Sequence, residues 1–354
     1  MLLTESEDSS MKMIQKSDLS RLFAAVAAKE TLYIPADNAA GKAEYKVYEE
    51  GMKLSAQLNT VRSAKDFFFP QTENMADFKV SGKSISVEIA ARADEDFTIF
   101  GVRACDAKSF QVLDNVFLGE PVDTFYQQRR LHATVVTMAC GRPEETCFCT
   151  VFGIDPANPA GDVSCWETAE GYCFAANTEK GEKWLEKVGA VLAETDESAV
   201  EAAKEKIHAI TEKLPLGKLP IEKFGNGDEM MDYFNRPEWK ELSQACLGCG
   251  TCTFVCPTCQ CFDIRDFDTG HGVKRTRCWD SCMYSDFTAM SAGQPRPTQV
   301  ERFRQRFMHK LFYYPMKNEG LYGCVGCGRC LQKCPVSLNI AKVMNALTKT
   351  KEEN

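Results

Sequence analysis

Two short stretches of the sequence each hold four cysteines at the same spacing. Residues 246 to 256 and residues 324 to 334 both read C-x2-C-x2-C-x3-C, and a proline follows the last cysteine of each stretch. In this pattern three thiolates of one run surround a 4Fe-4S cluster while the fourth ligates the other cluster. The spacing therefore predicts two 4Fe-4S clusters, held by Cys246, Cys249, Cys252 and Cys334 and by Cys324, Cys327, Cys330 and Cys256.

Glycines inside both runs support the cluster interpretation. Gly248, Gly250, Gly326 and Gly328 let the backbone approach a cluster without an intervening side chain. Structural zinc is the alternative, because C-x2-C pairs also build zinc sites. Each run, however, offers three thiolates and a remote fourth rather than two pairs. Two neighbouring clusters without an obvious open position for a substrate indicate one-electron transport.

Four further cysteines lie close to the first run. Cys259 and Cys261 follow it within C-P-T-C-Q-C, and Cys278 and Cys282 are four residues apart downstream. Together they could supply four thiolates to another metal, or they could be apolar side chains packed behind the cluster, since free cysteine is often buried.

A different cysteine group lies in the first half of the chain. Cys105 follows a strand-like run, and Cys140, Cys147 and Cys149 form C-x6-C-x-C after another. Loops at strand ends are a common place for a cofactor in an α/β domain. We expect a third iron-sulfur cluster here, although such a group could also arise by chance in so cysteine-rich a chain. Cys165 and Cys173 have no ligand-like spacing and are expected to be buried.

The composition of the chain indicates where the protein is located and which partners it does not bind. Eighteen cysteines in 354 residues favour metal ligation in a cytoplasmic protein, because thiols stay reduced there. The net charge of −8 argues against nucleic-acid binding. We see neither a signal peptide nor the roughly 18 consecutive apolar residues of a membrane span. The four histidines are dispersed, and no nucleotide-binding glycine motif occurs.

The elements that must position these cysteines suggest an α+β chain of two domains. Strand-like runs at residues 97 to 103 and 133 to 139 flank a helical pattern at 108 to 118, and an earlier strand is expected to stop at Pro35. This order predicts an N-terminal α/β domain. A linker rich in proline and glycine, residues 214 to 229, then predicts a boundary between domains 1–225 and 226–354.

The second domain should be mainly helical. Helical patterns cover residues 229 to 245 and 298 to 314, and the long gap between the two motifs favours an α-helical ferredoxin-type dicluster domain. In the second helix Phe303, Phe307 and Leu311 share one face, which we interpret as core. Basic residues near the motifs could raise cluster potentials, dock an acidic partner or simply face solvent; they are Lys274, Arg275, Arg277, Arg302, Arg304 and Arg306.

The motifs in combination resemble one known family. They are VRACD (102 to 106), C-x6-CFC (140 to 149), CLGCGTCTFVCPTCQC (246 to 261), WDSCM (279 to 283), ERFRQRFMHK (301 to 310) and CVGCGRC (324 to 330). They are similar to those of the iron-sulfur subunit shared by anaerobic sulfite reductase and, as the beta subunit, by cytoplasmic sulfhydrogenases. Cys278 is not part of the family pattern, so the resemblance leaves Cys259, Cys261 and Cys282 as extra candidate ligands and favours the N-terminal group as a cluster site.

The resemblance also implies a function. Members of the family relay electrons between a flavoprotein reductase subunit linked to NAD(P) and a catalytic metalloenzyme subunit, within a cytoplasmic anaerobic complex. We therefore expect an electron-transfer subunit without a catalytic residue of its own. The alternative is an enzyme with its own flavin or substrate site in the N-terminal domain.

Overall fold

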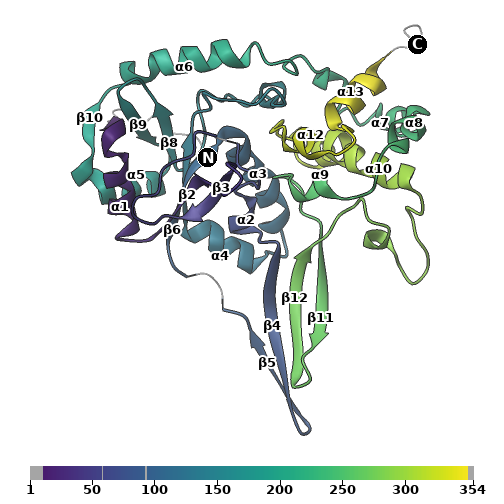
Figure 1. Ribbon diagram of the computed structural model, residues 1–354. Coiled ribbons are helices and arrows are strands. Elements are labelled where there is room, and N and C mark those ends of the chain that lie inside the picture. Colours follow the sequence, from purple (N-terminus) through teal and green to yellow (C-terminus); the bar gives the residue numbers. More distant parts are fainter. Residues whose placement is uncertain (1–10, 58, 92–93, 350–354) are drawn as a thin grey trace. The chain divides into compact units, whose positions relative to one another are not determined.

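The computed structural model describes residues 11 to 57, 59 to 91 and 94 to 349 (Figure 1). Residues 1 to 10, half of the N-terminal stretch in which we expect no signal peptide, lie outside the described residues. Contacts between Cα atoms divide the chain into two compact units. The first unit comprises Met1–Ala64, Asp94–Lys108 and Arg130–Gly217, and the second comprises Lys65–Ala93, Ser109–Arg129 and Lys218–Asn354. Each unit thus combines distant chain segments, and the boundary near residue 225 stays a prediction.

The first unit is built on an eight-stranded sheet, in the order β10-β1-β9-β8-β7-β6-β2-β3. The strands β2, β6, β7 and β8 are parallel neighbours, and the remaining pairs are antiparallel. Its strands are β1 Met11–Gln15, β2 Thr31–Asp37, β3 Ala43–Val47, β6 Phe97–Arg103, β7 Ala133–Met138, β8 Val163–Glu167, β9 Gly171–Ala176 and β10 Ala193–Thr195. The predicted strands at 97 to 103 and 133 to 139 are therefore confirmed as β6 and β7.

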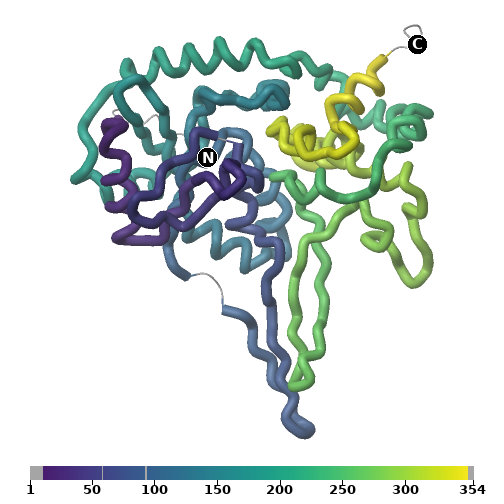
Figure 2. Tube along the Cα trace, in the orientation of Figure 1, coloured from purple at the N-terminus to yellow at the C-terminus, as the bar shows by residue number. Residues whose placement is uncertain are grey.

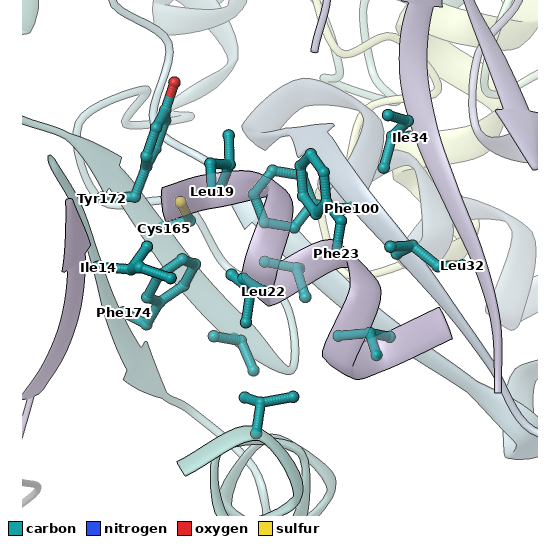
Figure 3. Packing of buried hydrophobic residues seen from close by; sticks show 14 of the residues in the cluster. Ile14, Leu19, Leu22, Phe23, Leu32, Ile34, Phe100, Cys165, Tyr172 and Phe174 are labelled. Carbon is teal, nitrogen blue, oxygen red and sulfur yellow. The ribbon is translucent and has the colours of Figure 1, made fainter. Parts of the chain in front are cut away.

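Hydrophobic residues cover both faces of this sheet, as its largely apolar, β-branched strands predict. Helices α1, Leu19–Ala27, and α5, Glu179–Val188, pack on one face, where Figure 3 shows Leu22 and Phe23 of α1 beside Phe100 and Phe174 of the sheet. Helix α6, Ser198–Thr211, packs on the other face. Successive side chains of a strand point to opposite faces, so Cys165 joins the first core while Trp166 joins the second.

The expectation that Pro35 ends its strand is wrong. Strand β2 continues to Asp37, and Pro35 lies opposite Tyr45 of β3. Proline is tolerated because β2 pairs with β6 only through residues 31 to 33, so the missing N–H of Pro35 interrupts no bond to β6.

Two helices pass from the residues of one unit into those of the other. Helix α3, Ala104–Phe117, begins directly after β6, and helix α4, Thr124–His132, precedes β7. The helical pattern at residues 108 to 118 thus marks the body of α3. Its first turn holds Cys105, so β6 and α3 together position the first of the N-terminal cysteines.

The second unit contains a four-stranded antiparallel sheet in the order β11-β12-β4-β5. Its strands are β4 Thr72–Ser81, β5 Ser84–Ile89, β11 Phe262–Asp268 and β12 Gly272–Trp279. Figure 2 shows the two hairpins lying side by side although about 200 residues separate them in the sequence, and β12 pairs with β4 through a bulge after Arg275. The segment between the cysteine motifs therefore contains strands as well as the helices that we had expected.

A buried arginine stabilises this pairing. The guanidinium of Arg277, on β12, forms ion pairs with Glu73 of β4 and with Asp123. Arg129 donates to the other oxygen of Glu73 at 2.7 Å. Only 2% of the Arg277 side chain is exposed, so its charge depends on these carboxylates.

Short helices make up the rest of the second unit. They are α2 Lys65–Phe68, α7 Met230–Phe234, α8 Glu238–Gln244, α9 Thr251–Phe254, α10 Gln299–Met308, a π-helical turn His309–Tyr313, α11 Tyr314–Lys317, α12 Arg329–Lys333 and α13 Ile340–Thr348. Short 3-10 turns in the two units cover Lys16–Asp18, Cys149–Phe152, Gly189–Val191, Ile221–Lys223 and Asp286–Thr288. The helix predicted at 229 to 245 is interrupted before Pro237, because proline disfavours a helical residue before it.

Helix α10 begins with a capping box formed by Thr298 and Glu301. Its Phe303 and Phe307 pack on Trp239 of α8, so the predicted apolar stripe is core. Across the described residues, no helix is long and apolar enough to cross a membrane.

Candidate iron-sulfur sites

Four cysteines of the two C-terminal motifs surround one cavity. Cys246, Cys249 and Cys252 line it from the first motif and Cys334 from the second. We call these four the first cysteine set. Met283, Phe303 and Phe307 form an apolar part of the wall, and Arg306 is the one cation that lines it among the described residues. The structure thus brings together the four residues that the spacing assigned to one cluster.

Left-handed glycines shape the loops that carry these thiols. The φ angles of Gly248 and Gly250 are +65° and +72°, and those of Gly326 and Gly328 are +57° and +77°. Gly250 and Gly328 directly precede helices α9 and α12. A Cβ atom on Gly250 would lie 2.6 Å from the Tyr284 hydroxyl. Both motifs therefore need glycine for conformation, and Gly250 also needs it for space.

Hydrogen bonds reach two sulfurs of the first set. The backbone N–H of Leu338 donates to Cys334 Sγ at 3.2 Å. Cys249 Sγ lies 3.4 Å from Thr251 Oγ1, and this hydrogen bond lowers the pKa of the Cys249 thiol. Cys249 is also exposed, so the first set reaches the surface of the second unit.

The other four motif cysteines form a second cysteine set, Cys256, Cys324, Cys327 and Cys330. Burial raises the pKa of Cys324 to about 12, and the charges of Cys256 and Cys327 add to this rise. Burial also raises the pKa of Cys330, with the same two sulfurs contributing. Because these electrostatic effects act between near neighbours, they bring Cys256 of the first motif together with three cysteines of the second.

Two buried cations lie beside these sets. Lys310 Nζ donates to Thr258 Oγ1 and to the carbonyl oxygen of Gly323, both at 2.8 Å. Arg306 Nη2 donates to the carbonyl oxygen of Cys252 at 3.4 Å. The sequence left open whether Arg306 faces solvent, and the structure buries it at 3% exposure. Arg306 and Lys310 lie one helical turn apart on the flank of the apolar stripe, and this spacing was the available signal.

The remaining basic residues near the motifs differ from Arg306. Lys274 and Arg275 are exposed on β12 and face Asp77 and Asp266, whereas Arg277 is buried in the carboxylate contacts described above. Arg304 stacks on the ring of Phe234 at 3.7 Å. Arg302 donates to backbone carbonyls before α10. Of these six residues, Arg306 is the one that lines the cysteine cavity.

The extra cysteines form contacts of their own. Cys259 forms a hydrogen bond with Cys256, which raises the pKa of Cys259 and lowers that of Cys256. Cys261 and Cys282 form a second such pair, which lowers the pKa of Cys261 and raises that of Cys282. Cys278 instead lies on β12 opposite Asp263. The structure therefore groups Cys259, Cys261 and Cys282 without Cys278.

The N-terminal cysteine set converges on one arginine. Cys105, Cys140, Cys147 and Cys149 are all buried, with exposures of 3% to 8%. Arg103, the last residue of β6, lies with Nη1 3.9 Å from Cys147 Sγ and donates through Nη2 to Asn59 at 2.7 Å. Burial opposes its charge, but Cys105, Cys140 and Cys147 together with Asp106 raise the pKa of Arg103 above its ordinary value. Burial likewise raises the pKa of Cys149 to about 12, and Cys140 and Cys147 contribute.

The donors around these sets suit an anionic sulfur-rich group. Arg103 Nε and Arg306 Nε are buried and have no hydrogen-bond partner in the described structure. A buried N–H without an acceptor is unfavourable, and the sulfurs of a bound cluster would provide acceptors. The buried thiols, unpartnered guanidinium donors and left-handed loops therefore fit iron-sulfur clusters at these positions.

No three or more His, Cys, Asp or Glu side chains lie close enough together to hold a single metal ion, in the part of the chain that the structure describes. A zinc ion requires its thiolates at about 2.3 Å from one point. A four-iron cluster spreads its four thiolates around a larger body.

The residues to which we gave no ligand role lie elsewhere. Cys165 and Cys173 are fully buried in the first unit, as expected. His132 lies 2.8 Å from Asp96, and His208 lies 3.0 Å from Asp155. His309 is mostly buried, which lowers its pKa to about 4.

The first unit also contains a cavity of about 580 Å³. Lys16, Arg142 and Lys206 line it, together with Glu167, which forms ion pairs with Lys16 at 3.3 Å and Arg142 at 3.0 Å. Its volume lies in the range of small-molecule sites. Ala139 and Gly141, the neighbours of Cys140, form part of its wall.

Comparisons with known proteins agree with the motif analysis. Residues 245 to 338 match the family model described as a 4Fe-4S dicluster domain. The chain is 32% identical over 289 residues to sulfhydrogenase 2 subunit beta of Pyrococcus furiosus, an alignment that covers 81% of this chain and 83% of the relative.

Proposed function

The chain belongs to the iron-sulfur subunit family that includes the sulfhydrogenase beta subunit, and on that premise we propose that it is an electron-transfer subunit of an oxidoreductase complex. The observation that carries this proposal is the cavity lined by Cys246, Cys249, Cys252 and Cys334. Two distant motifs supply its thiols in the proportion of three to one, which is how paired 4Fe-4S clusters are ligated.

We assign one cluster to the first cysteine set and one to the second. When bound, each cluster supplies a site that accepts and donates one electron. The chain's own residues hold the thiolates, exclude water from Cys256 and Cys327, and place Arg306 and Lys310 beside the sulfurs. Cys249 is exposed, which makes the first set the better point for electron exchange with another protein.

We propose a third cluster at the N-terminal set. The support is the burial of Cys105, Cys140, Cys147 and Cys149 around the Arg103 guanidinium. A thiol cluster near a cation favours the thiolate form, which iron requires. Cys259, Cys261 and Cys282 stay candidates for additional ligands.

The partners follow from the family. The relative's name describes a beta subunit of a sulfhydrogenase, so we infer that this chain also works beside other subunits. The proposed neighbours are a flavoprotein subunit linked to NAD(P) and a catalytic metalloenzyme subunit, in a cytoplasmic complex. This chain would then connect hydride chemistry at one partner to metal chemistry at the other.

Iron and sulfide analysis of the anaerobically purified protein tests the proposal. We expect about twelve irons per chain if all three sets hold a 4Fe-4S cluster and about eight if only the C-terminal sets do. The preparation should be brown and bleach on reduction. Fewer than about four irons per chain would exclude the electron-transfer function.

One observation favours a second candidate, a small-molecule site in the first unit. The 580 Å³ cavity lies beside Cys140 and carries three cationic side chains. A flavin or substrate bound there would make the chain an enzyme rather than a relay. A flavin absorbance that stays with the isolated chain would support this alternative, and its absence from a fully iron-loaded preparation would argue against a flavin.

A further inference from the structure

Arg306 and Lys310 lie one helical turn apart, between the two cysteine motifs in sequence. Arg306 belongs to the last turn of α10 and Lys310 to the π-helical turn that follows. Their exposures are 3% and 4%, and within the described structure neither forms an ion pair with a carboxylate. Burying an unpaired cation is strongly unfavourable, so each must find negative charge nearby.

Sulfur supplies the negative charge near Lys310. Its ammonium group donates to Thr258 Oγ1 and Gly323 O, both close in sequence to cysteines of the second set. Burial opposes the charge of Lys310, but Cys256, Cys259 and Cys324 raise its pKa above the ordinary value. Two of these three cysteines belong to the second set and none to the first.

Arg306 acts on both sets. It lines the cavity of the first set and donates to the carbonyl oxygen of Cys252. Among the cysteines that raise its pKa, against the opposing effect of burial, Cys252 comes first and Cys330 of the second set follows. Its unpartnered Nε–H is free to donate to a sulfur.

Lys65 provides a contrast to Lys310. It is equally buried, but nearby negative charge offsets the cost of burying its ammonium group less well. Its Nζ donates to the carbonyl oxygen of Cys259 at 3.1 Å and lies 3.5 Å from the ring centre of Trp279. Burial lowers the pKa of Lys65 despite the opposing charges of Cys259 and Cys256. Cys256 and Cys259 act on both lysines, whereas Cys324 of the second set is named only for Lys310 and the Lys310 cation lowers the pKa of Lys65 further.

We propose that Arg306 and Lys310 tune the two C-terminal clusters unequally, Arg306 raising the reduction potentials of both and Lys310 raising that of the second set alone. This proposal rests on the proposed function, because it takes both sets as cluster ligands. Reduction adds negative charge to an already anionic cluster. A fixed cation at short range stabilises the reduced form more than the oxidised form, and burial weakens solvent screening of that effect.

Redox titration of the full-length protein, followed by electron paramagnetic resonance, tests the proposal. The variants are Arg306→Met, Lys310→Met and the charge-keeping Arg306→Lys. Arg304→Met is the matched control, since Arg304 lies on the same helix but stacks on Phe234. A Cys327→Ala variant identifies the signal of the second set by its loss.

In Lys310→Met the equilibrium constant for reduction at the second set should fall by about tenfold, or about 59 mV for a one-electron couple, with the first set unchanged. In Arg306→Met the reduction potentials of both sets should fall. In Arg306→Lys, which keeps the positive charge, both potentials should lie close to those of the wild type. Arg304→Met should match the wild type.

Iron content separates the two possible failures. Wild-type protein with fewer than about four irons overturns the proposed function and this inference with it. Variants that keep full iron content but titrate at wild-type potentials overturn the inference and leave the proposed function standing. Should a methionine variant lose iron, the uncharged Arg306→Gln and Lys310→Gln variants replace it. If the two replacements then shift both cluster potentials by the same amounts, the unequal roles are contradicted.

Discussion

The N-terminal set and the two C-terminal sets bring cysteines together in different ways. The N-terminal thiols lie at the ends of β6 and β7 and in the loop after β7, so a large sheet with its own core positions them. The C-terminal thiols lie on loops and in short helices, such as the four-residue α9, which holds Cys252, and the five-residue α12, which holds Cys330. Isolated helices of that length are not stable in water.

The difference teaches that the two kinds of site depend differently on their metal. The sheet of the first unit is covered on both faces by hydrophobic residues, so its thiols are placed by burial. The C-terminal loops need left-handed glycines, a few hydrogen bonds and, by our proposal, the clusters themselves. Metal binding should therefore contribute to folding mainly in the second unit.

Removing the iron from the whole protein gives the largest expected effect. Anaerobic chelation should remove the hydrogen-exchange protection of residues 246 to 258 and 324 to 338, because their short helices lose the bonds that hold them. Strands β6, β7 and β8 should stay protected. Hydrogen exchange followed by mass spectrometry measures both regions in one sample, and equal loss in the two regions would contradict the contrast.

Single cysteine replacements separate the sites. Cys327→Ala and Cys147→Ala should each lower the iron content by about four per chain, because each removes one ligand of a proposed cluster. Cys165→Ala is the control, since Cys165 is buried in the core of the first unit and should leave the iron content unchanged. A Cys147→Ala variant with full iron would remove the third cluster from the proposal while leaving the other two.

Replacing Arg277 tests how much the stability of the second unit depends on buried ion pairs rather than on hydrophobic packing. Arg277→Met leaves Asp123 without its buried partner and Glu73 with Arg129 alone, which should cost up to about 3–5 kcal/mol in the free energy of unfolding. Urea denaturation under anaerobic conditions measures it. Arg275→Met, two residues away on the same strand and exposed, should leave the urea midpoint nearly unchanged.

The pH dependence should also differ between the units, because the buried histidine lies in the second. Burial lowers the pKa of His309 to about 4, so the folded protein keeps it neutral while the unfolded chain, with an ordinary pKa near 6.5, binds a proton. Stability from this group is complete above about pH 6.5 and falls as the pH drops towards 4, by about 2 kcal/mol at pH 5. His309→Gln should show a smaller loss between pH 7 and pH 5 in urea midpoints, and an identical loss would argue against a neutral buried histidine.

The smallest expected effect is that of a single left-handed glycine. Gly328→Ala places a Cβ atom at a φ of +77°, which should cost about 1–2 kcal/mol. Gly189→Ala in the first unit is the control, since Gly189 has right-handed helical angles and open space around its Cα atom. Thermal unfolding of both variants compares the two positions, and similar stability changes would mean that the motif glycines are not conformationally required.

Local patterns in the sequence predicted much of the scaffold. The strands β6 and β7 were visible because a strand covered on both faces is largely apolar and β-branched, and the α10 stripe was visible through its helical period. Pro35 was misjudged, because its tolerance depends on how far β6 extends along β2, which no local pattern records. The pairing of β4 with β12 joins segments about 200 residues apart, beyond the reach of any periodicity.

The candidate sites were predicted to different degrees for the same reason. The dicluster domain followed from motif spacing and the family from the resemblance of the combined motifs, and the comparisons confirm both. The individual ligand assignments stay predictions, although the structure groups the cysteines as the spacing indicated. The helical spacing of Arg306 and Lys310 beside the apolar stripe was too weak a signal to separate them from surface cations, because their burial arises from packing between chain segments that the sequence does not place.

The interleaving of the two motifs has a consequence for biosynthesis. Each proposed C-terminal set takes three cysteines from one motif and one from the other, so neither is complete until the ribosome has added residues 324 to 334. The N-terminal set is complete once Cys149 has been translated. By our proposal, the cysteines of the N-terminal set are therefore all available earlier in synthesis than those of either C-terminal set, which needs residues 324 to 334 as well as the first motif.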